Sequence, residues 1–103
     1  MDGRMTYTML KIPDLPTTIT DNETLLLELL VSTATTINAT IKSTFATRFS
    51  PHGVSAIVAI AESHIAVHTF PEVGIAQFEI ATCSDTMDVV LGINHIITQL
   101  VNG

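Results

Sequence analysis

The sequence predicts an α+β fold, a two-layer sandwich in which two helices pack on one face of a mainly antiparallel sheet. Two stretches carry apolar residues at helical spacing, over about 21–43 and about 86–101. Between them, short runs rich in Val, Ile and Ala lie at 54–60, 65–69 and 75–82. This order of elements is typical of helices that are segregated to one face of an antiparallel sheet.

The first predicted elements are a strand near 5–12 and the helix over 21–43. Thr20 and Glu23 have the Thr-x-x-Glu spacing of a capping box. The apolar stripe behind them consists of Leu26, Leu30, Ala34, Ile37 and Ile41. Threonines are frequent in this segment, and branching at Cβ makes them poor helix formers, so we expect packing to hold the helix in place.

The middle of the chain is predicted to form two or three antiparallel strands. The tetrapeptide Ala61-Glu62-Ser63-His64 separates the first two runs, and polar and apolar residues alternate through 75–82. Pro71 and Gly74 mark a turn.

The last predicted element is the helix over 86–101. Ser84-Asp85-Thr86 can cap it, and Gly92 weakens it slightly. Its apolar stripe consists of Val89, Ile93, Ile96, Ile97 and Leu100.

Composition limits the class of protein. A length of 103 residues predicts a single domain, 1–103. A formal net charge of −6 argues against a nucleic-acid binder. Only 14% of the residues are charged, so we expect another subunit to cover part of the surface. A single cysteine, and the lack of a signal peptide or membrane-spanning run, predict a cytoplasmic protein with no membrane partner.

Glu62 and Ser63 lie between two apolar runs, where a constrained turn can press the Ser63 hydroxyl against the Glu62 carbonyl. That geometry suits an N-to-O acyl shift, with His68 or His64 as the proton carrier. Elimination and hydrolysis then leave a pyruvoyl group at residue 63, an electron sink made from the chain itself. Taken alone, the Glu-Ser-His triplet is a weak signal, and a polar turn between two strands is the alternative.

Several other polar and aromatic residues can be interpreted as structural rather than functional. His64 and His68 are four residues apart and share a strand face, but no further His or Cys cluster supports a metal site. Cys83 is expected to be a small buried residue, and Ser55 to fill a strand. Phe49 and Phe70 flank turn residues and belong either to the core or to the wall of a pocket.

The segment FSPHGVSAIVAIAESHIAVHTFPEVGIAQFEIATCSD, residues 49–85, resembles without a gap the core of the small prokaryotic S-adenosylmethionine decarboxylases. The specific elements are FSPHGVS at 49–55, Glu62-Ser63-His64, His68-Thr69, Pro71-Glu72 and Thr82-Cys83. The resemblance implies self-cleavage into a β chain, 1–62, and an α chain, 63–103, with the pyruvoyl cofactor at position 63. It also implies a homodimer with an αββα arrangement, in which two sheets face each other between outer helices.

The resemblance also implies roles for individual residues. His68 would carry protons during processing, and Ser55 would hydrogen-bond to the reacting carbonyl. In turnover the substrate amine would form a Schiff base with the pyruvoyl ketone, and Cys83 would return a proton to the α-carbon. Glu72 is the position expected to bind the ribose hydroxyls, and Phe49 a wall for adenine.

The implied activity is decarboxylation of S-adenosylmethionine, which supplies the aminopropyl donor for spermidine synthesis. This chain has Phe70, Val73 and Ile75 where the family commonly has larger aromatic residues. These residues leave open, as an alternative, the same pyruvoyl chemistry on ornithine or arginine. A second alternative is an uncleaved relative that acts as a binding or regulatory subunit.

Overall fold

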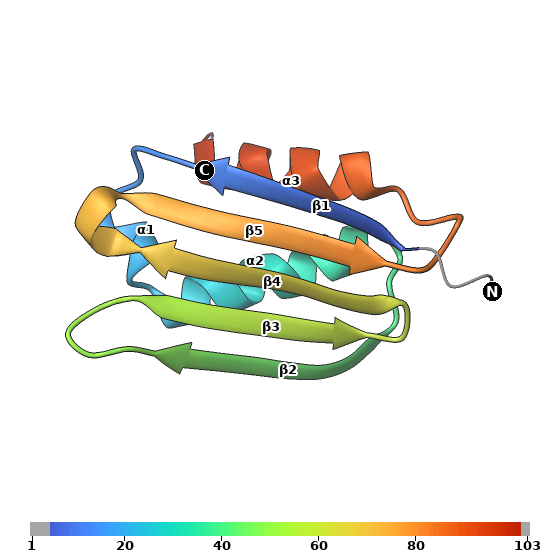
Figure 1. The fold of residues 1–103 in the computed structure, drawn as a ribbon, viewed down its shortest axis with the longest axis horizontal. Helices are drawn as coiled ribbons and strands as arrows, with labels where there is room; N and C mark the ends of the chain where they lie inside the picture. Colours follow the sequence, from blue (N-terminus) through green and yellow to red (C-terminus); the bar gives the residue numbers. More distant parts are fainter. Residues whose placement is uncertain (1–4, 102–103) are drawn as a thin grey trace.

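The computed structural model describes residues 5–101, and these residues form one sheet with helices on one side (Figure 1). The elements in order are β1 (Thr6–Ile12), α1 (Thr17–Thr20), α2 (Glu23–Thr36), β2 (Ile41–Arg48), β3 (Val54–Ile60), β4 (Ser63–Phe70), the short helix η1 (Pro71–Val73), β5 (Ile75–Thr82) and α3 (Val89–Val101). The strand order is β1-β5-β4-β3-β2, and every pairing is antiparallel. The predicted two-layer α+β fold is therefore confirmed.

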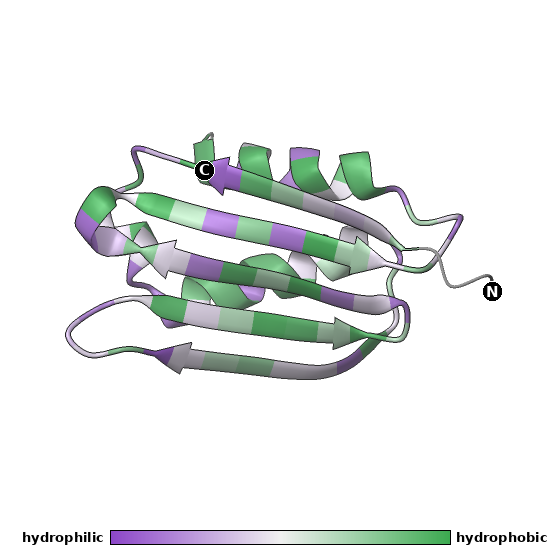
Figure 2. Ribbon diagram, viewed as in Figure 1, coloured by the Kyte–Doolittle hydropathy of each residue, from purple (hydrophilic) through white to green (hydrophobic). Residues whose placement is uncertain are grey.

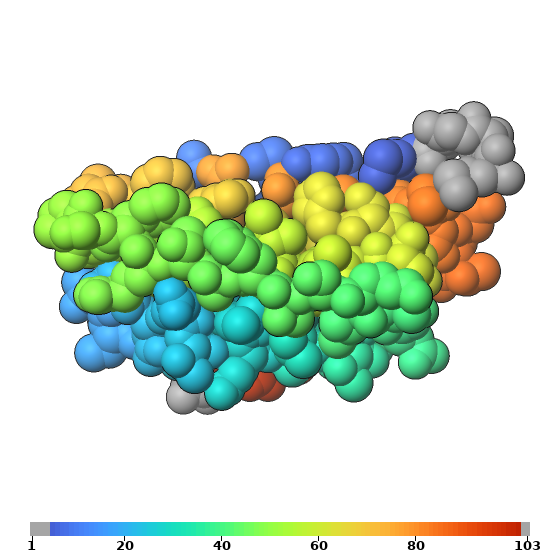
Figure 3. Space-filling view, turned by 90° about the horizontal axis from the view of Figure 1, so that it is seen from below, coloured from blue at the N-terminus to red at the C-terminus, as the bar shows by residue number. Residues whose placement is uncertain are grey.

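The two faces of the sheet differ in what covers them. One face packs against α2 and α3, and its side chains form the core, with Phe78, Ile80 and Ile65 fully buried. The helix layer lies only on this side (Figure 3). The other face, called the open face below, carries the alternate residues of each strand, and polar and apolar residues alternate along β5 (Figure 2). Large apolar side chains that are exposed on it include Tyr7, Met9, Phe45 and Ile57.

The helix predicted over 21–43 is shorter than expected, and a strand follows it. Asn22, rather than Thr20, caps α2 by accepting a hydrogen bond from the Leu25 backbone N–H. The helix ends at Thr36 because Asn38 takes a left-handed conformation with φ 63°, and the Ala39 N–H then donates to the Ala34 carbonyl. Strand β2 was missed because it lies at the sheet edge and is mostly exposed, so it has no strong apolar alternation.

The remaining predictions need smaller changes. The strands at 54–60 and 75–82 are confirmed, while the one predicted at 65–69 extends over Ser63–Phe70. Helix α3 begins at Val89, and Asp88 caps it through the Leu91 N–H, in place of the predicted segment 84–86. A Cβ on Gly92 would lie 3.0 Å from Ile80 Cδ1, so the glycine lets α3 approach the sheet closely.

Candidate active site

The Glu62–Ser63 peptide lies at the tip of the tight β3–β4 hairpin. Ile60 pairs with Ser63, so Ala61 and Glu62 alone form the turn. Ser63 has φ 147°, a conformation that favours glycine and is strained for a residue with a side chain. Strain of this kind costs on the order of 1–3 kcal/mol and persists only where the surroundings enforce it.

Three hydrogen bonds enforce the conformation of this hairpin. The Ala61 N–H donates to the Thr40 carbonyl over 2.8 Å, and the Thr40 N–H donates to Glu62 Oε1 over 3.3 Å. On the other side, the Cys83 N–H donates to the Glu62 carbonyl oxygen over 3.0 Å. This last bond polarises the carbonyl next to the Ser63 hydroxyl and provides a donor for negative charge that develops on its oxygen.

Cys83 follows directly after β5, beside the hairpin. Its side chain is only partly buried, so the expectation of a buried cysteine is wrong. The thiol lies in the wall of a pocket of about 220 Å³, which Met5, Thr6, Thr82, Ser84 and Asp85 also line. Thr82, which also lines this pocket, is the cross-strand partner of Ser63.

Ser55 and His68 form a separate pair on the open face, toward the end of β4 that carries Phe70. They are direct partners across β3 and β4, and Ser55 Oγ lies 2.8 Å from His68 Nδ1. His68 is five residues from Ser63 along one strand, a separation of roughly 16 Å. Within one chain, therefore, His68 does not reach Ser63, and its role in processing stays a prediction.

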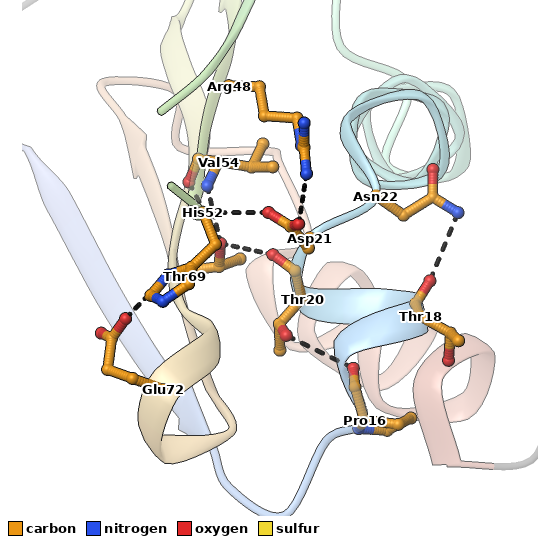
Figure 4. Close-up of polar contacts among 11 residues, drawn as sticks. Pro16, Thr18, Thr20, Asp21, Asn22, Arg48, His52, Val54, Thr69 and Glu72 are labelled. Carbon is orange, nitrogen blue, oxygen red and sulfur yellow. Dashed lines mark hydrogen bonds and ion pairs between the residues drawn. The ribbon is translucent and has the colours of Figure 1, made fainter. Parts of the chain in front are cut away.

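The predicted substrate-binding residues lie at the opposite end of β4 from Ser63. Phe70 ends the strand, roughly 23 Å from Ser63 at 3.3 Å per residue. Glu72 follows it in η1, where its Oε2 lies 3.0 Å from His52 Nδ1, without the angles of a hydrogen bond (Figure 4). Phe49 and Phe70 are about half exposed. Glu72, Phe49 and Phe70 thus gather at one end of the molecule, and Glu62, Ser63 and Cys83 at the other.

Asp21 holds the loop that carries Phe49. Its carboxylate accepts hydrogen bonds from Arg48 and from the Gly53 N–H, as Figure 4 shows for the Arg48 contact. These two bonds, the Arg48 bond first, hold the pKa of the Asp21 carboxyl below its usual value of 3.8. Sequence reasoning missed Asp21, because the contact joins residues far apart in the chain and no local pattern marks it.

Asp21→Asn is expected to lower the stability of the protein at neutral pH but not in acid. Because folding lowers the pKa of the Asp21 carboxyl, its stabilisation is present above 3.8 and is lost as the pH falls through the lower folded value. Thermal unfolding of both proteins between pH 7 and pH 3 measures this difference. A stability difference that stays constant over this range would contradict the explanation.

Two absences hold for residues 5–101. No group of three or more His, Cys, Asp or Glu side chains there is arranged to hold a metal ion. None of the helices in the same residues has both the length and the apolar character needed to cross a membrane.

An antiparallel sheet with helices on one face is also found in a class of decarboxylases of known structure. Its structure is similar to the crystal structure of the adenosylmethionine decarboxylase from Aquifex aeolicus, with a TM-score of 0.83 and 31% sequence identity. That similarity covers 93% of this chain and 78% of the other. Residues 7–102 match the model of the S-adenosylmethionine decarboxylase family, and the chain belongs to this family.

Curated relatives agree with this assignment. An S-adenosylmethionine decarboxylase proenzyme from Carboxydothermus hydrogenoformans is 46% identical over 61 residues, which cover 59% of this chain and 48% of the relative. A second, from Aquifex aeolicus, is 41% identical over 73 residues, covering 71% and 54%. A third, from Thermoanaerobacter sp. (strain X514), is 38% identical over 82 residues, covering 80% and 66%. The matched part of this chain spans from about half to about two thirds of the relatives' length.

Proposed function

We propose that this chain is the precursor of a pyruvoyl-dependent decarboxylase that acts on S-adenosylmethionine and cleaves itself between Glu62 and Ser63. The observation that carries the proposal is the hairpin tip, where a strained serine follows a carbonyl that already accepts a hydrogen bond from the Cys83 N–H. The naming of the relatives as proenzymes supports it.

In the first step, Ser63 Oγ attacks the carbonyl carbon of Glu62. The negative charge develops on the Glu62 oxygen, where the Cys83 N–H stabilises it. The carbon–nitrogen bond then breaks, and an ester links the two residues. Relief of the Ser63 conformation favours this step, because strain of about 1–3 kcal/mol is released when the peptide opens.

The ester separates the chain by β-elimination, in which the Ser63 Cα proton leaves and Glu62 departs as a carboxylate. Hydrolysis of the remaining enamine releases ammonia and leaves a pyruvoyl group on residue 63. This group supplies an electron sink for loss of carbon dioxide. Cys83, whose backbone N–H is bonded to the Glu62 carbonyl, would return a proton from its thiol to the substrate carbon.

We further infer that a complete site needs two copies of the chain. The Ser55–His68 pair and the residues Phe49 and Glu72 lie too far from Ser63 in one chain for a small substrate to contact both groups. The exposed apolar side chains of the open face are suited to packing against a second sheet. Two sheets packed face to face would supply Ser55 and His68 of one copy to Ser63 of the other.

Mixing two defective variants tests this arrangement. Ser63→Ala and His68→Ala chains are each expected to release almost no carbon dioxide from carboxyl-labelled S-adenosylmethionine. Unfolded together and refolded at a one-to-one ratio, they are expected to recover about one quarter of wild-type activity, because half of the dimers are mixed and each has one intact site. Samples refolded separately and then assayed at once are the control.

The outcomes separate the parts of the proposal. If the wild type is fully active but the mixture recovers no activity, only the sharing of one site between two copies is contradicted. If the cleaved wild-type protein releases labelled carbon dioxide only from ornithine or arginine, that amino acid is the substrate in place of S-adenosylmethionine. No release from any of the three substrates would contradict the decarboxylase.

A further inference from the structure

A line of polar contacts runs across the open face from Ser63 to the edge of the sheet. Ser63 Oγ lies 3.3 Å from His64 Nδ1, and His64 Nε2 lies 3.5 Å from Glu79 Oε1. The other carboxylate oxygen of Glu79 accepts a hydrogen bond from the Tyr7 hydroxyl. Four side chains from β4, β5 and β1 are thus connected in the order Ser63, His64, Glu79, Tyr7.

The sheet register explains why these side chains meet. Ala81 in β5 pairs with His64 on one side and with Tyr7 on the other. The small side chain of Ala81 leaves room for the two rings to approach edge to face, with centroids 6.3 Å apart. Glu79 is two residues before Ala81 on the same face, and so lies diagonal to both rings.

The contacts favour one position for the imidazole proton. His64 Nε2 lies 3.5 Å from a carboxylate oxygen of Glu79, and since a carboxylate can only accept, this proximity favours a hydrogen on Nε2. The other nitrogen, Nδ1, then has a free lone pair directed at Ser63 Oγ, and the hydroxyl donates to it. Tyr7 donates to Glu79, and this bond raises the pKa of Tyr7 above its usual value.

We propose that His64 is the general base of self-cleavage within each chain, and that Glu79 and Tyr7 position its imidazole. This inference rests on the self-cleavage proposed above. His64 Nδ1 removes the proton from Ser63 Oγ as the oxygen attacks the Glu62 carbonyl carbon. The imidazolium then gives the proton to the Ser63 nitrogen as the carbon–nitrogen bond breaks, so the histidine ends neutral. The Glu79 carboxylate, 3.5 Å from Nε2, stabilises the positive charge in between.

The two histidines of β4 contact different serines. His64 touches the reacting serine of its own chain, whereas His68 lies roughly 16 Å away on Ser55. His68→Ala is not a control for this step, because two sheets packed face to face would bring His68 of a second copy to Ser63.

The test is the first-order rate at which newly made full-length chain converts to fragments 1–62 and 63–103. The chain is synthesised in a cell-free system with a short pulse of label, and the two forms are separated by mass at successive times. His64→Ala is expected to slow cleavage about 100-fold or more, the usual contribution of a positioned base. His95→Ala in α3 is the matched control and is expected to cleave as the wild type does.

The positioning residues are tested through their dependence on His64. Glu79→Gln is expected to slow cleavage, and Tyr7→Phe to slow it about tenfold, the effect of one hydrogen bond to a charged group. If Glu79 acts through His64, the double variant His64→Ala/Glu79→Gln cleaves no more slowly than His64→Ala alone. A purely structural role would make the two effects multiply.

The possible results are distinct. If the wild type cleaves and His64→Ala cleaves at the same rate, the role of His64 is refuted and the self-processing enzyme stands. If the effects of His64→Ala and Glu79→Gln on the cleavage rate multiply, the positioning of His64 by Glu79 is refuted. A wild-type chain that never cleaves refutes the proposed function, and this inference with it. Should His64→Ala not fold, His64→Asn fills the same space without a base and gives the same comparison.

Discussion

Ser63→Ala is expected to leave the chain at full length indefinitely, while the wild type separates into fragments 1–62 and 63–103. The alanine keeps the hairpin and its hydrogen bonds, which involve the backbone of Ala61, the carbonyl of Glu62 and the Glu62 side chain. It removes the one atom that attacks the Glu62 carbonyl, so cleavage is expected to be undetectable rather than slow. The intact mass of each purified protein, followed over days, gives the result.

Two controls make the result specific. Ser32→Ala removes a hydroxyl from α2, away from the hairpin, and is expected to cleave as the wild type does. Ser63→Cys retains a nucleophile at the same position and is expected to cleave, because a thiol can make the corresponding shift. Separation of Ser63→Ala into fragments 1–62 and 63–103 would show that cleavage does not need the serine hydroxyl.

Cys83→Ala is expected to cleave normally but to decarboxylate S-adenosylmethionine about 10²- to 10⁴-fold more slowly. Two different parts of this residue serve the two reactions. Its backbone N–H holds the Glu62 carbonyl during cleavage, and an alanine retains that group. Its thiol borders the adjoining pocket and is the proposed proton donor in turnover, and an alanine lacks it.

The measurement compares cleavage, by intact mass, with release of labelled carbon dioxide from the cleaved protein. Ser84→Ala alters a neighbouring wall of the same pocket without removing an ionisable group and serves as the control. Wild-type turnover by cleaved Cys83→Ala would remove the thiol from the mechanism. Failure to cleave would instead assign its side chain to processing.

The fold was predictable wherever burial imposes a strict period on the sequence. Strands β3 and β5 lie inside the sheet, and their predicted bounds are those observed, because one face of each packs into the core. The edge strand β2 was missed and joined to the preceding helix, because its exposed residues need not follow any apolar pattern. A single left-handed residue, Asn38, ends that helix, and the apolar spacing of the segment gave no sign of it.

The candidate site, too, was only partly predictable from the sequence. The identity and order of its residues, from Phe49 to Cys83, are visible in the sequence, because they lie in one continuous segment with motifs at fixed spacing. Their grouping is not visible there. Residues that are close in sequence, such as Ser63 and His68, are separated by the length of an extended strand.

By itself, then, the sequence determined the two-layer fold, the family and the serine at which the chain is proposed to cleave. Tertiary structure alone decided which groups meet that serine: the Cys83 N–H on the Glu62 carbonyl, and the line from His64 through Glu79 to Tyr7. The physical reason is that hydrophobic periodicity records which face of an element is buried, whereas these contacts depend on cross-strand register between segments far apart in the chain. Register is set by the packing of the whole sheet, and no local stretch of sequence contains it.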